Sequence, residues 1–146
     1  MSYIVSHFNE PGKALESYIA IGGEGSMMSV KALWDKNFEQ TLISDGIIKM
    51  INPLQKSKTK IVSKDEIFES AIYSISISLS DEITFRDVEV QNADLSEKEV
   101  DIVIGMDIIS RGDFEVRNYN NIVEFAFRIP PKNEPIFDSN NILNTF

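Results

Sequence analysis

The stretch that decides the fold is Val30-Lys31-Ala32-Leu33-Trp34-Asp35. Its mainly apolar residues predict a strand, and this strand carries a single carboxylate, Asp35, to its end. A short apolar segment, Thr41-Leu42-Ile43-Ser44, follows after a more polar loop. The sequence therefore predicts one acidic side chain at the start of a loop between two β segments.

A second apolar stretch lies far downstream and reads Val100-Asp101-Ile102-Val103-Ile104-Gly105-Met106-Asp107-Ile108-Ile109. Its uninterrupted apolar run, Ile102 to Ile104, is typical of a strand that is buried on both faces. Beyond that run we expect a short helical turn, with Asp107 as its cap. Gly112 is expected to end the turn in a left-handed conformation.

Further elements are predicted on both sides of Asp35. Leu15 to Ile21 and Met28 to Trp34 are expected to be strands joined by the turn Gly22-Gly23-Glu24-Gly25. These glycines could form a phosphate-binding loop, but no Lys-Ser/Thr pair and no helix follow them, so we interpret them as a hairpin turn. A short helix is predicted from Ser44, which can cap it, to Asn52-Pro53, which ends it.

The second half of the chain is dominated by β patterns. From Ala71 to Leu79 the odd positions are apolar and serines alternate with them, which places the apolar set on one face of a strand. Ile83 to Val90 is predicted to be the next strand. Phe114 to Val116 and Ile122 to Ile129 are predicted to form a hairpin.

The charges of this last hairpin are expected on its outer side. In the second arm, Phe125 and Phe127 should lie on one face, whereas Glu124 and Arg128 should point the other way. Asp113 and Glu115 are interpreted as surface charges on the neighbouring strand, and Trp34 as a core or interface residue.

Length and composition limit the domain organisation. The chain has 146 residues and no visible internal repeat, which fits one domain that can bury a core without disulfides. We expect residues 1–13 to be a flexible N-terminal segment and residues 14–131 to be the folded domain. Residues 132–146 are expected to be a polar tail, either disordered or acting as a docking strand.

Several functional classes are disfavoured by the same composition. There is no cysteine, and the single histidine, His7, is expected to be exposed in the N-terminal segment, so we expect no metal, no cofactor and no Ser-His-Asp triad. The net charge of −9 argues against nucleic-acid binding. No apolar run reaches the length of a membrane span and no secretory signal is visible, so a cytoplasmic location is expected.

Three groups of residues together resemble a retropepsin-like aspartic protease domain of the kind found in bacterial proteins. They are Leu33-Trp34-Asp35 with Ile43-Ser44, the stretch from Ile104 to Ile109 continuing to Gly112-Asp113-Phe114, and the closing Phe125 to Pro130. The resemblance extends from Leu15 to Pro130. It implies a mostly β fold, a closed β-barrel forming a single lobe of the acid-protease fold, with one or two short helices. It also implies that an active site would need a homodimer, in which each chain supplies one aspartate, here Asp35.

The loop after Asp35 departs from the pattern of that family, which would read Asp-Thr-Gly-Ala-Thr over positions 35–39, with a Ser at position 41. Lys36 stands where the family threonine bonds to the partner chain, and a lysine cannot accept that hydrogen bond. Asn37 and Phe38 add bulk at the glycine and alanine positions. Thr41 falls where the family serine would steady the aspartate.

The hairpin that would close over a substrate is also altered. Its expected tip contains Lys64, Asp65 and Glu66 and has no glycine. The leading hypothesis is therefore a degenerate, non-catalytic retropepsin-like domain that acts by protein or peptide binding and by self-association. Asp35 is the candidate catalytic residue, one per chain. The candidate binding residues are Lys36, Asn37, Phe38, Thr41, Lys64, Asp65, Glu66 and Gly105.

Two alternatives stay open at this point. The first is an active homodimeric aspartic endopeptidase that uses Asp35 from each chain. The second is a small acidic inhibitor or adaptor protein of a mobile element, which only the net charge and the small size support.

Overall fold

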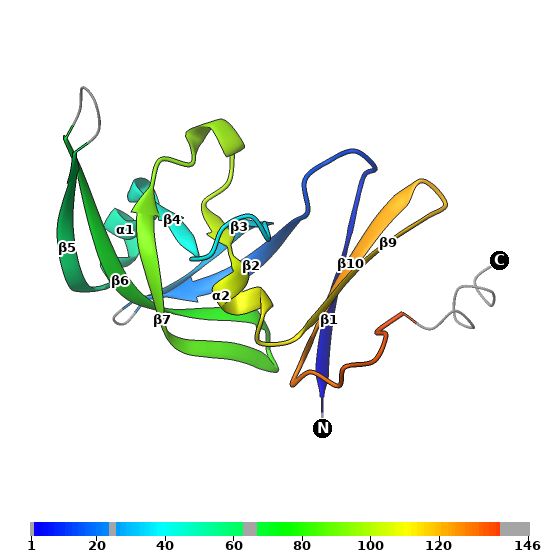
Figure 1. Cartoon of the computed structure of the whole chain (residues 1–146). Helices are drawn as coiled ribbons and strands as arrows, with labels where there is room; N and C mark the ends of the chain where they lie inside the picture. Colours follow the sequence, from blue (N-terminus) through cyan, green and yellow to red (C-terminus); the bar gives the residue numbers. More distant parts are fainter. Residues whose placement is uncertain (1, 24–25, 63–66, 138–146) are drawn as a thin grey trace.

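The protein combines a β-barrel with a separate three-stranded sheet (Figure 1). The computed structural model describes residues 2–23, 26–62 and 67–137. Strands predominate in this part of the chain, and the helices are short. None of the helices in these ranges is long and apolar enough to cross a membrane.

Six strands close the barrel, because β2 pairs with β3 on one side and with β6 on the other. In order around the barrel they are β2 (Glu16–Gly22), β3 (Met27–Trp34), β8 (Ile102–Ile104), β4 (Leu42–Ser44), β7 (Ile83–Ala93) and β6 (Ile67–Ser80). A further strand, β5 (Leu54–Val62), pairs with β6 only. The closed barrel predicted from the sequence is confirmed.

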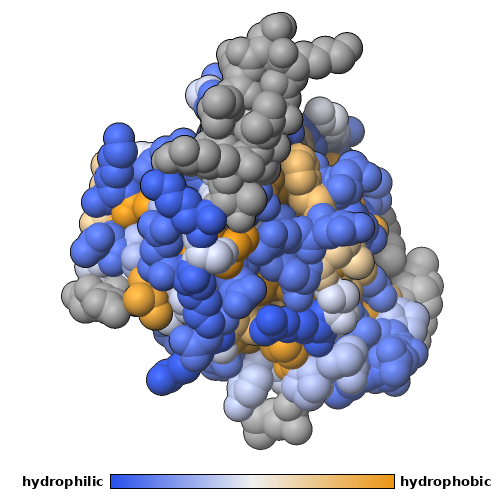
Figure 2. All heavy atoms as spheres, turned by 60° about the vertical axis from the view of Figure 1, so that its left-hand side comes forward, coloured by the Kyte–Doolittle hydropathy of each residue, from blue (hydrophilic) through white to orange (hydrophobic). Residues whose placement is uncertain are grey.

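The hydrophobic patterns place these strands as expected. Along β6 the apolar residues Ala71, Ile75, Ile77 and Leu79 are buried, and the alternating serines are partly exposed. Strand β8, which lies between β3 and β4, is completely buried because Ile102 and Ile104 pack into the main core on one face and Val103 packs into a second apolar cluster on the other. Both predictions are confirmed. The side that carries β5 comes forward in Figure 2, where most of the surface is hydrophilic.

The first helix, α1 (Asp45–Ile51), forms where its sequence signals predict it. The Ser44 hydroxyl accepts a hydrogen bond from the Ile47 N–H at 3.4 Å, and Asn52 ends the helix in the left-handed region at φ 46°. Ile47 and Ile51 bury the inner face of the helix. The other helices are the 3-10 turn η1 (Ser96–Lys98) and the short α2 (Met106–Ile109).

The predicted ends of α2 were wrong. Gly105 is the N-cap residue, and Asp107 lies inside the helix, where its carboxylate makes contacts described below. Gly112 does not adopt a left-handed backbone. Glycine is needed there for space, because an added Cβ would meet the Arg128 carbonyl oxygen and, at 2.8 Å, the Phe127 ring.

The three-stranded sheet, here called the terminal sheet, has the order β1-β10-β9. Its strands are β1 (Tyr3–Asn9), β10 (Ile122–Ile129) and β9 (Asp113–Tyr119). The expectation of a flexible segment over residues 1–13 is therefore corrected, since most of it forms an ordered strand. Tyr3 and Val5 pack against the core, and β1 pairs with β10 along its whole length.

His7 is also placed differently from the prediction. It lies in β1, half-buried, with its ring centroid 5.3 Å from that of Phe125. Its Nε2 is buried without a hydrogen-bond partner among the described residues. This burial lowers the pKa of His7 below its usual value, because the partly buried imidazole has lost water that would solvate its charged form.

Aromatic residues join the terminal sheet to the barrel. The Trp34 ring, at the end of β3, stacks on Phe114 with centroids 5.6 Å apart and also contacts Phe125 and Phe127. Its indole N–H donates to the Ser17 hydroxyl at 2.8 Å, so the one polar atom of the ring is satisfied. Trp34 is only 4% exposed, which confirms its interpretation as a core residue.

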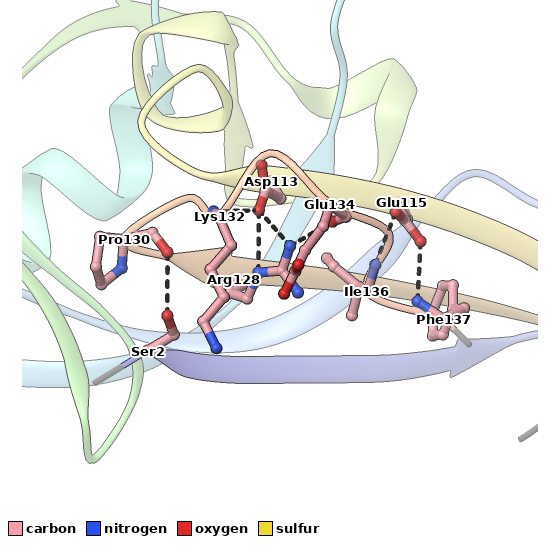
Figure 3. Close-up of polar contacts among 9 residues, drawn as sticks. All are labelled: Ser2, Asp113, Glu115, Arg128, Pro130, Lys132, Glu134, Ile136 and Phe137. Carbon is pink, nitrogen blue, oxygen red and sulfur yellow. Dashed lines mark hydrogen bonds and ion pairs between the residues drawn. The ribbon is translucent and has the colours of Figure 1, made fainter.

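The outer face of the terminal sheet is covered by residues 132–137, here called the C-terminal strap (Figure 3). The Asp113 carboxylate accepts hydrogen bonds from the Arg128 guanidinium at 2.6 Å and from the Lys132 amide at 2.8 Å. The two oxygens of Glu115 accept the Ile136 and Phe137 amides at 2.8 and 3.0 Å.

The strap explains why several charges of this sheet are not on the surface. Glu124 and Arg128 do point away from the aromatic face, as predicted, but they are buried. Asp113 and Glu115, expected to be surface charges, hold the strap instead. Of the predicted tail, residues 138–146 lie outside the described residues.

Candidate functional site

Asp35 lies directly after β3, at the end of the barrel where β8 also ends. Its amide donates to the Ile104 carbonyl at 3.0 Å, which continues the parallel pairing of β3 with β8. The side chain is half-buried. Strand β3 thus ends directly at Asp35, as the sequence predicted.

The loop after Asp35 closes on that same carboxylate. Asp35 Oδ1 accepts the Asn37 amide at 2.9 Å, and the Asp35 carbonyl accepts the Phe38 amide at 3.4 Å. These bonds form a compact turn in which the aspartate stabilises its own loop. Asn37 is exposed and is not among the residues with positive φ, so the loop does not use the left-handed backbone that an asparagine tolerates.

Lys36 extends from this turn toward the terminal sheet. Its side-chain nitrogen lies 5.2 Å from the centroid of the Phe114 ring, within the range of a cation–π contact. Phe114 in turn stacks on Trp34. The lysine at the threonine position of the family pattern is therefore held by the aromatic residues that join the barrel to the terminal sheet.

The Phe38 side chain packs in an apolar cluster separate from the main core. It packs against a small apolar cluster formed by Leu33, Leu95, Val100 and Val103. Lys98 lies over the other side, 5.3 Å from the ring centroid. The volume added at this position is accommodated in a satellite core under the 3-10 turn.

Thr41 is bound to Asp107, not to the predicted candidate Asp35. Its hydroxyl donates to Asp107 Oδ1 at 2.7 Å, and its amide donates to Oδ2 of the same carboxylate at 3.1 Å. The Thr41 hydroxyl also accepts the Gly105 amide at 3.2 Å. Since Thr41 is completely buried, these bonds fix the end of the Asp35 loop to the start of α2.

Backbone contacts complete this attachment. The Phe38 carbonyl accepts the Met106 amide at 2.8 Å, and the Glu39 carbonyl accepts the Asp107 amide at 3.1 Å. Gly105 permits the approach, because a Cβ there would lie 2.8 Å from the Phe38 oxygen and 2.9 Å from the Gln40 carbonyl carbon. The loop is consequently rigidly supported along most of its length.

The structure brings together six of the predicted site residues: Asp35, Lys36, Asn37, Phe38, Thr41 and Gly105. The other three, Lys64, Asp65 and Glu66, lie outside the described residues. Two contributors were missed. Asp107 had been assigned to a cap, and Phe114 carried no sequence signal that linked it to the loop.

The chemistry that this arrangement can perform is limited within one chain. Aspartic proteolysis uses two carboxylates about 3 Å apart that share a proton. Two carboxylates are hydrogen-bonded to the Asp35 loop, Asp35 and Asp107, and both oxygens of Asp107 are bound by Thr41. Asp35 would therefore need a second carboxylate from another chain. In the described ranges, no three His, Cys, Asp or Glu side chains gather into a possible metal site.

Comparison with solved structures relates this architecture to known proteins. The chain is similar to a retropepsin-like aspartic protease from Rickettsia conorii, with 10% sequence identity, a TM-score of 0.57, and coverage of 88% of this chain and 95% of that one. It also matches the retroviral protease-like domain of Ddi1 from Leishmania major, with 14% identity, a TM-score of 0.46, and coverage of 77% and 94%. No family model and no curated protein sequence matched.

The protein therefore has the retropepsin-like fold, as its sequence predicted. At this level of identity the likeness concerns the fold, and the activity has to be argued from the residues of the Asp35 loop.

Proposed function

We propose that this protein is a degenerate, non-catalytic retropepsin-like domain that binds an extended peptide or a protein segment and self-associates. The observation that carries the proposal is the Asp35 loop, in which Lys36 and Asn37 follow the aspartate. In this loop Asp35 Oδ1 accepts the Asn37 amide, and Lys36 lies over Phe114.

Pairing of two such loops would meet an electrostatic cost. A proteolytic dimer requires both Asp35 carboxylates to approach to about 3 Å, together with the residues that follow them. Each chain would bring a lysine where a small hydroxyl residue serves in the family pattern. A charged ammonium is costly to bury without a partner, and Lys36 has its Phe114 contact within its own chain.

The same loop is well built for binding. Thr41, Asp107 and Gly105 hold it in one conformation, so little conformational entropy is lost when a ligand arrives. An extended peptide would lie beside Asp35 and the exposed Asn37, held by backbone hydrogen bonds in the manner of an added strand. Exposed Lys36 would favour an acidic residue in that peptide.

The test has a catalytic arm and a binding arm. The purified protein is incubated with a diverse fluorogenic peptide library from acid to neutral pH. We expect the wild type to cleave no more peptide than the Asp35→Asn variant does. Binding is measured by selection from a displayed peptide library, followed by calorimetry with the selected peptides. We expect Asn37→Asp to weaken binding of acidic peptides and the distant Lys49→Asp, on α1, to leave it unchanged. Cleavage that is lost in Asp35→Asn would overturn the non-catalytic assignment.

The second candidate is an active homodimeric aspartic endopeptidase. It is favoured by the placement of the Asp35 carboxylate at the end of β3 in this fold. It predicts pepstatin-sensitive cleavage that rises with protein concentration as dimers form. A mixture of wild type and Asp35→Asn chains would then show less activity than the wild type alone at the same wild-type concentration.

A further inference from the structure

Strand β9 makes different contacts with its two faces. On the inner face, the Phe114 ring stacks on Trp34, with centroids 5.6 Å apart, and lies 5.2 Å from the side-chain nitrogen of Lys36. On the outer face, the residues before and after it, Asp113 and Glu115, hold the C-terminal strap (Figure 3). Because successive side chains of a strand point to opposite faces, one short segment connects the strap with the loop of the candidate site.

The end of the strap is bound through its backbone. The two carboxylate oxygens of Glu115 accept the amides of Ile136 and Phe137, at 2.8 and 3.0 Å. Hydrogen bonds from backbone N–H groups to an ionised carboxylate are stronger than bonds between neutral groups. Glu115 is therefore the main anchor of this part of the strap.

The start of the strap is held in the same way. Asp113 accepts the Lys132 amide at 2.8 Å, and Arg128, which is paired with Asp113, donates to the Glu134 carbonyl. These bonds use backbone groups of the strap, so they do not depend on its side chains.

Apolar packing adds little to these bonds. Residues 131–135 are exposed, and within the strap Ile136 and Phe137 are half-buried. The Arg117 guanidinium lies over the Phe137 ring, 4.3 Å from its centroid. Segments with few buried apolar contacts open at a lower free energy than the core of a protein. We therefore expect the strap to leave the sheet without unfolding it.

Strand β9 depends on the strap because it lies at an edge of the terminal sheet. Within the described part of the chain it pairs with β10 alone. The strap supplies bonds to both residues that flank Phe114. When the strap is released, β10 and the aromatic contacts are left to position the Phe114 ring.

The position of Lys36 depends in turn on Phe114. The lysine is exposed and directly follows Asp35. A cation–π contact requires the charged group to lie within about 6 Å of the ring centroid. Since the distance from Lys36 is 5.2 Å, a small displacement of the ring is enough to break the contact.

We propose that the C-terminal strap controls the Asp35 loop: bound to β9, it holds Lys36 in place through Phe114, and its release lowers the affinity of the loop for a peptide. A lysine that is already positioned loses less conformational entropy when it meets an acidic residue of the peptide. The last step rests on the proposed function, whereas the link from the strap to Phe114 can be measured without a peptide. Two distinct sites and two states of one segment make this an allosteric coupling.

Ile136→Pro tests the attachment of the strap, because proline has no amide hydrogen to donate to Glu115. Ile136→Ala is the matched control, since it keeps this donor. Trypsin cleavage after Lys132, followed by mass spectrometry of the released fragment, measures how often the strap opens. Cleavage should be about tenfold faster in Ile136→Pro than in Ile136→Ala. Glu115→Ala removes the same bonds from the acceptor side and should also be cleaved faster. No acceleration in either Ile136→Pro or Glu115→Ala would overturn the proposal.

Trp34 measures the coupling directly, because it is the only tryptophan of the chain and stacks on Phe114. Ile136→Pro should change the near-ultraviolet circular dichroism and the fluorescence of Trp34, and Ile136→Ala should keep the wild-type spectra. Unchanged Trp34 spectra in a variant whose strap is cleaved faster would show that the strap does not act on Phe114, and the proposal would fail.

Peptide affinity tests the last step. A peptide selected on the wild type should bind Ile136→Pro about fivefold or more weakly in calorimetry. In a Lys36→Ala background, Ile136→Pro should cause little further loss, because both changes act through the same lysine. Additive losses, or an unchanged affinity of Ile136→Pro, would contradict control through Lys36. A wild type that binds no peptide contradicts the proposed function instead, and the trypsin and Trp34 measurements still decide whether the strap acts on Phe114.

Discussion

Thr41 and Asp107, 66 residues apart in the sequence, form a two-point contact at 2.7 and 3.1 Å that fixes the Asp35 loop to α2. Both carboxylate oxygens of Asp107 are used, one by the hydroxyl and one by the amide of Thr41. Both bonds are partly shielded from water, and a shielded hydrogen bond to an ionised group is stronger than one at the surface.

Replacing Thr41 by valine should lower the free energy of unfolding by about 2 kcal/mol, because a buried hydrogen bond to a carboxylate is removed at nearly constant volume. Urea unfolding followed by circular dichroism measures the change. Thr41→Ser is the matched control, since it keeps the hydroxyl, and it should lose clearly less. Equal losses in both variants would show that the methyl group and not the hydrogen bond matters.

Gly105→Ala should destabilise the protein by about 1–3 kcal/mol, because the added Cβ meets backbone atoms of Phe38 and Gln40 that cannot move freely. Gly46 provides a matched control within α1, where an added Cβ would meet nothing within 4 Å outside its chain neighbours and the backbone of its own helix. Gly46→Ala should be neutral or stabilise the protein by up to about 1 kcal/mol through helix propensity. Thermal unfolding of the two variants compares them directly, and a Gly105→Ala variant as stable as the wild type would contradict the packing.

Asp113 should make the protein acid-sensitive. The Lys132 amide and the Arg128 guanidinium hold the pKa of Asp113 below its usual value of 3.8. The unfolded chain therefore takes up a proton at a higher pH than the folded one, so the stabilisation is fully present above about pH 4 and is lost as the pH falls through the folded pKa. Asp113→Asn should flatten the dependence of the urea midpoint on pH between about 5 and 3. An unchanged slope would refute this role.

His7 should make the stability of the protein depend on pH in a range closer to neutrality than Asp113 does. Because burial lowers its pKa below 6.5, the unfolded state binds a proton first as the pH falls. Stability should then decrease from about pH 6.5 downward until the folded-state pKa is reached. His7→Gln cannot titrate and should remove this decrease, which unfolding midpoints at pH 7.5 and 5.5 would reveal. The same decrease in both proteins would assign it to other groups.

Much of the barrel could be predicted because its signals are local. The alternation in β6, the continuous apolar run of β8 and the Ser44 and Asn52 caps of α1 each depend on residues a few positions apart. The Asp35 loop was located for the same reason, since a strand pattern ends at the aspartate.

The predictions that were wrong concern contacts between distant segments. Residues 1–13 were expected to be flexible, whereas β1 pairs with β10, more than a hundred residues away, and local patterns carry no signal of that pairing. Thr41 was assigned to Asp35 and Asp107 to a helix cap, although each is the main partner of the other. The spacing of Asp113 and Glu115 along their strand predicted surface charges. They accept hydrogen bonds from the backbone amides of the C-terminal strap, which packs back onto the sheet.

The amino-acid sequence by itself determined which segments form the six strands of the barrel, which residue stands at the end of β3, and that the loop after it carries a lysine and an asparagine. These properties follow from side-chain periodicity and capping, which operate over one or two turns of chain. Only the tertiary structure decided that Thr41 bonds to Asp107, that the C-terminal strap binds Asp113 and Glu115 of β9, and that β1 pairs with β10. The physical reason is that such contacts depend on how strands from opposite ends of the chain close around a common core.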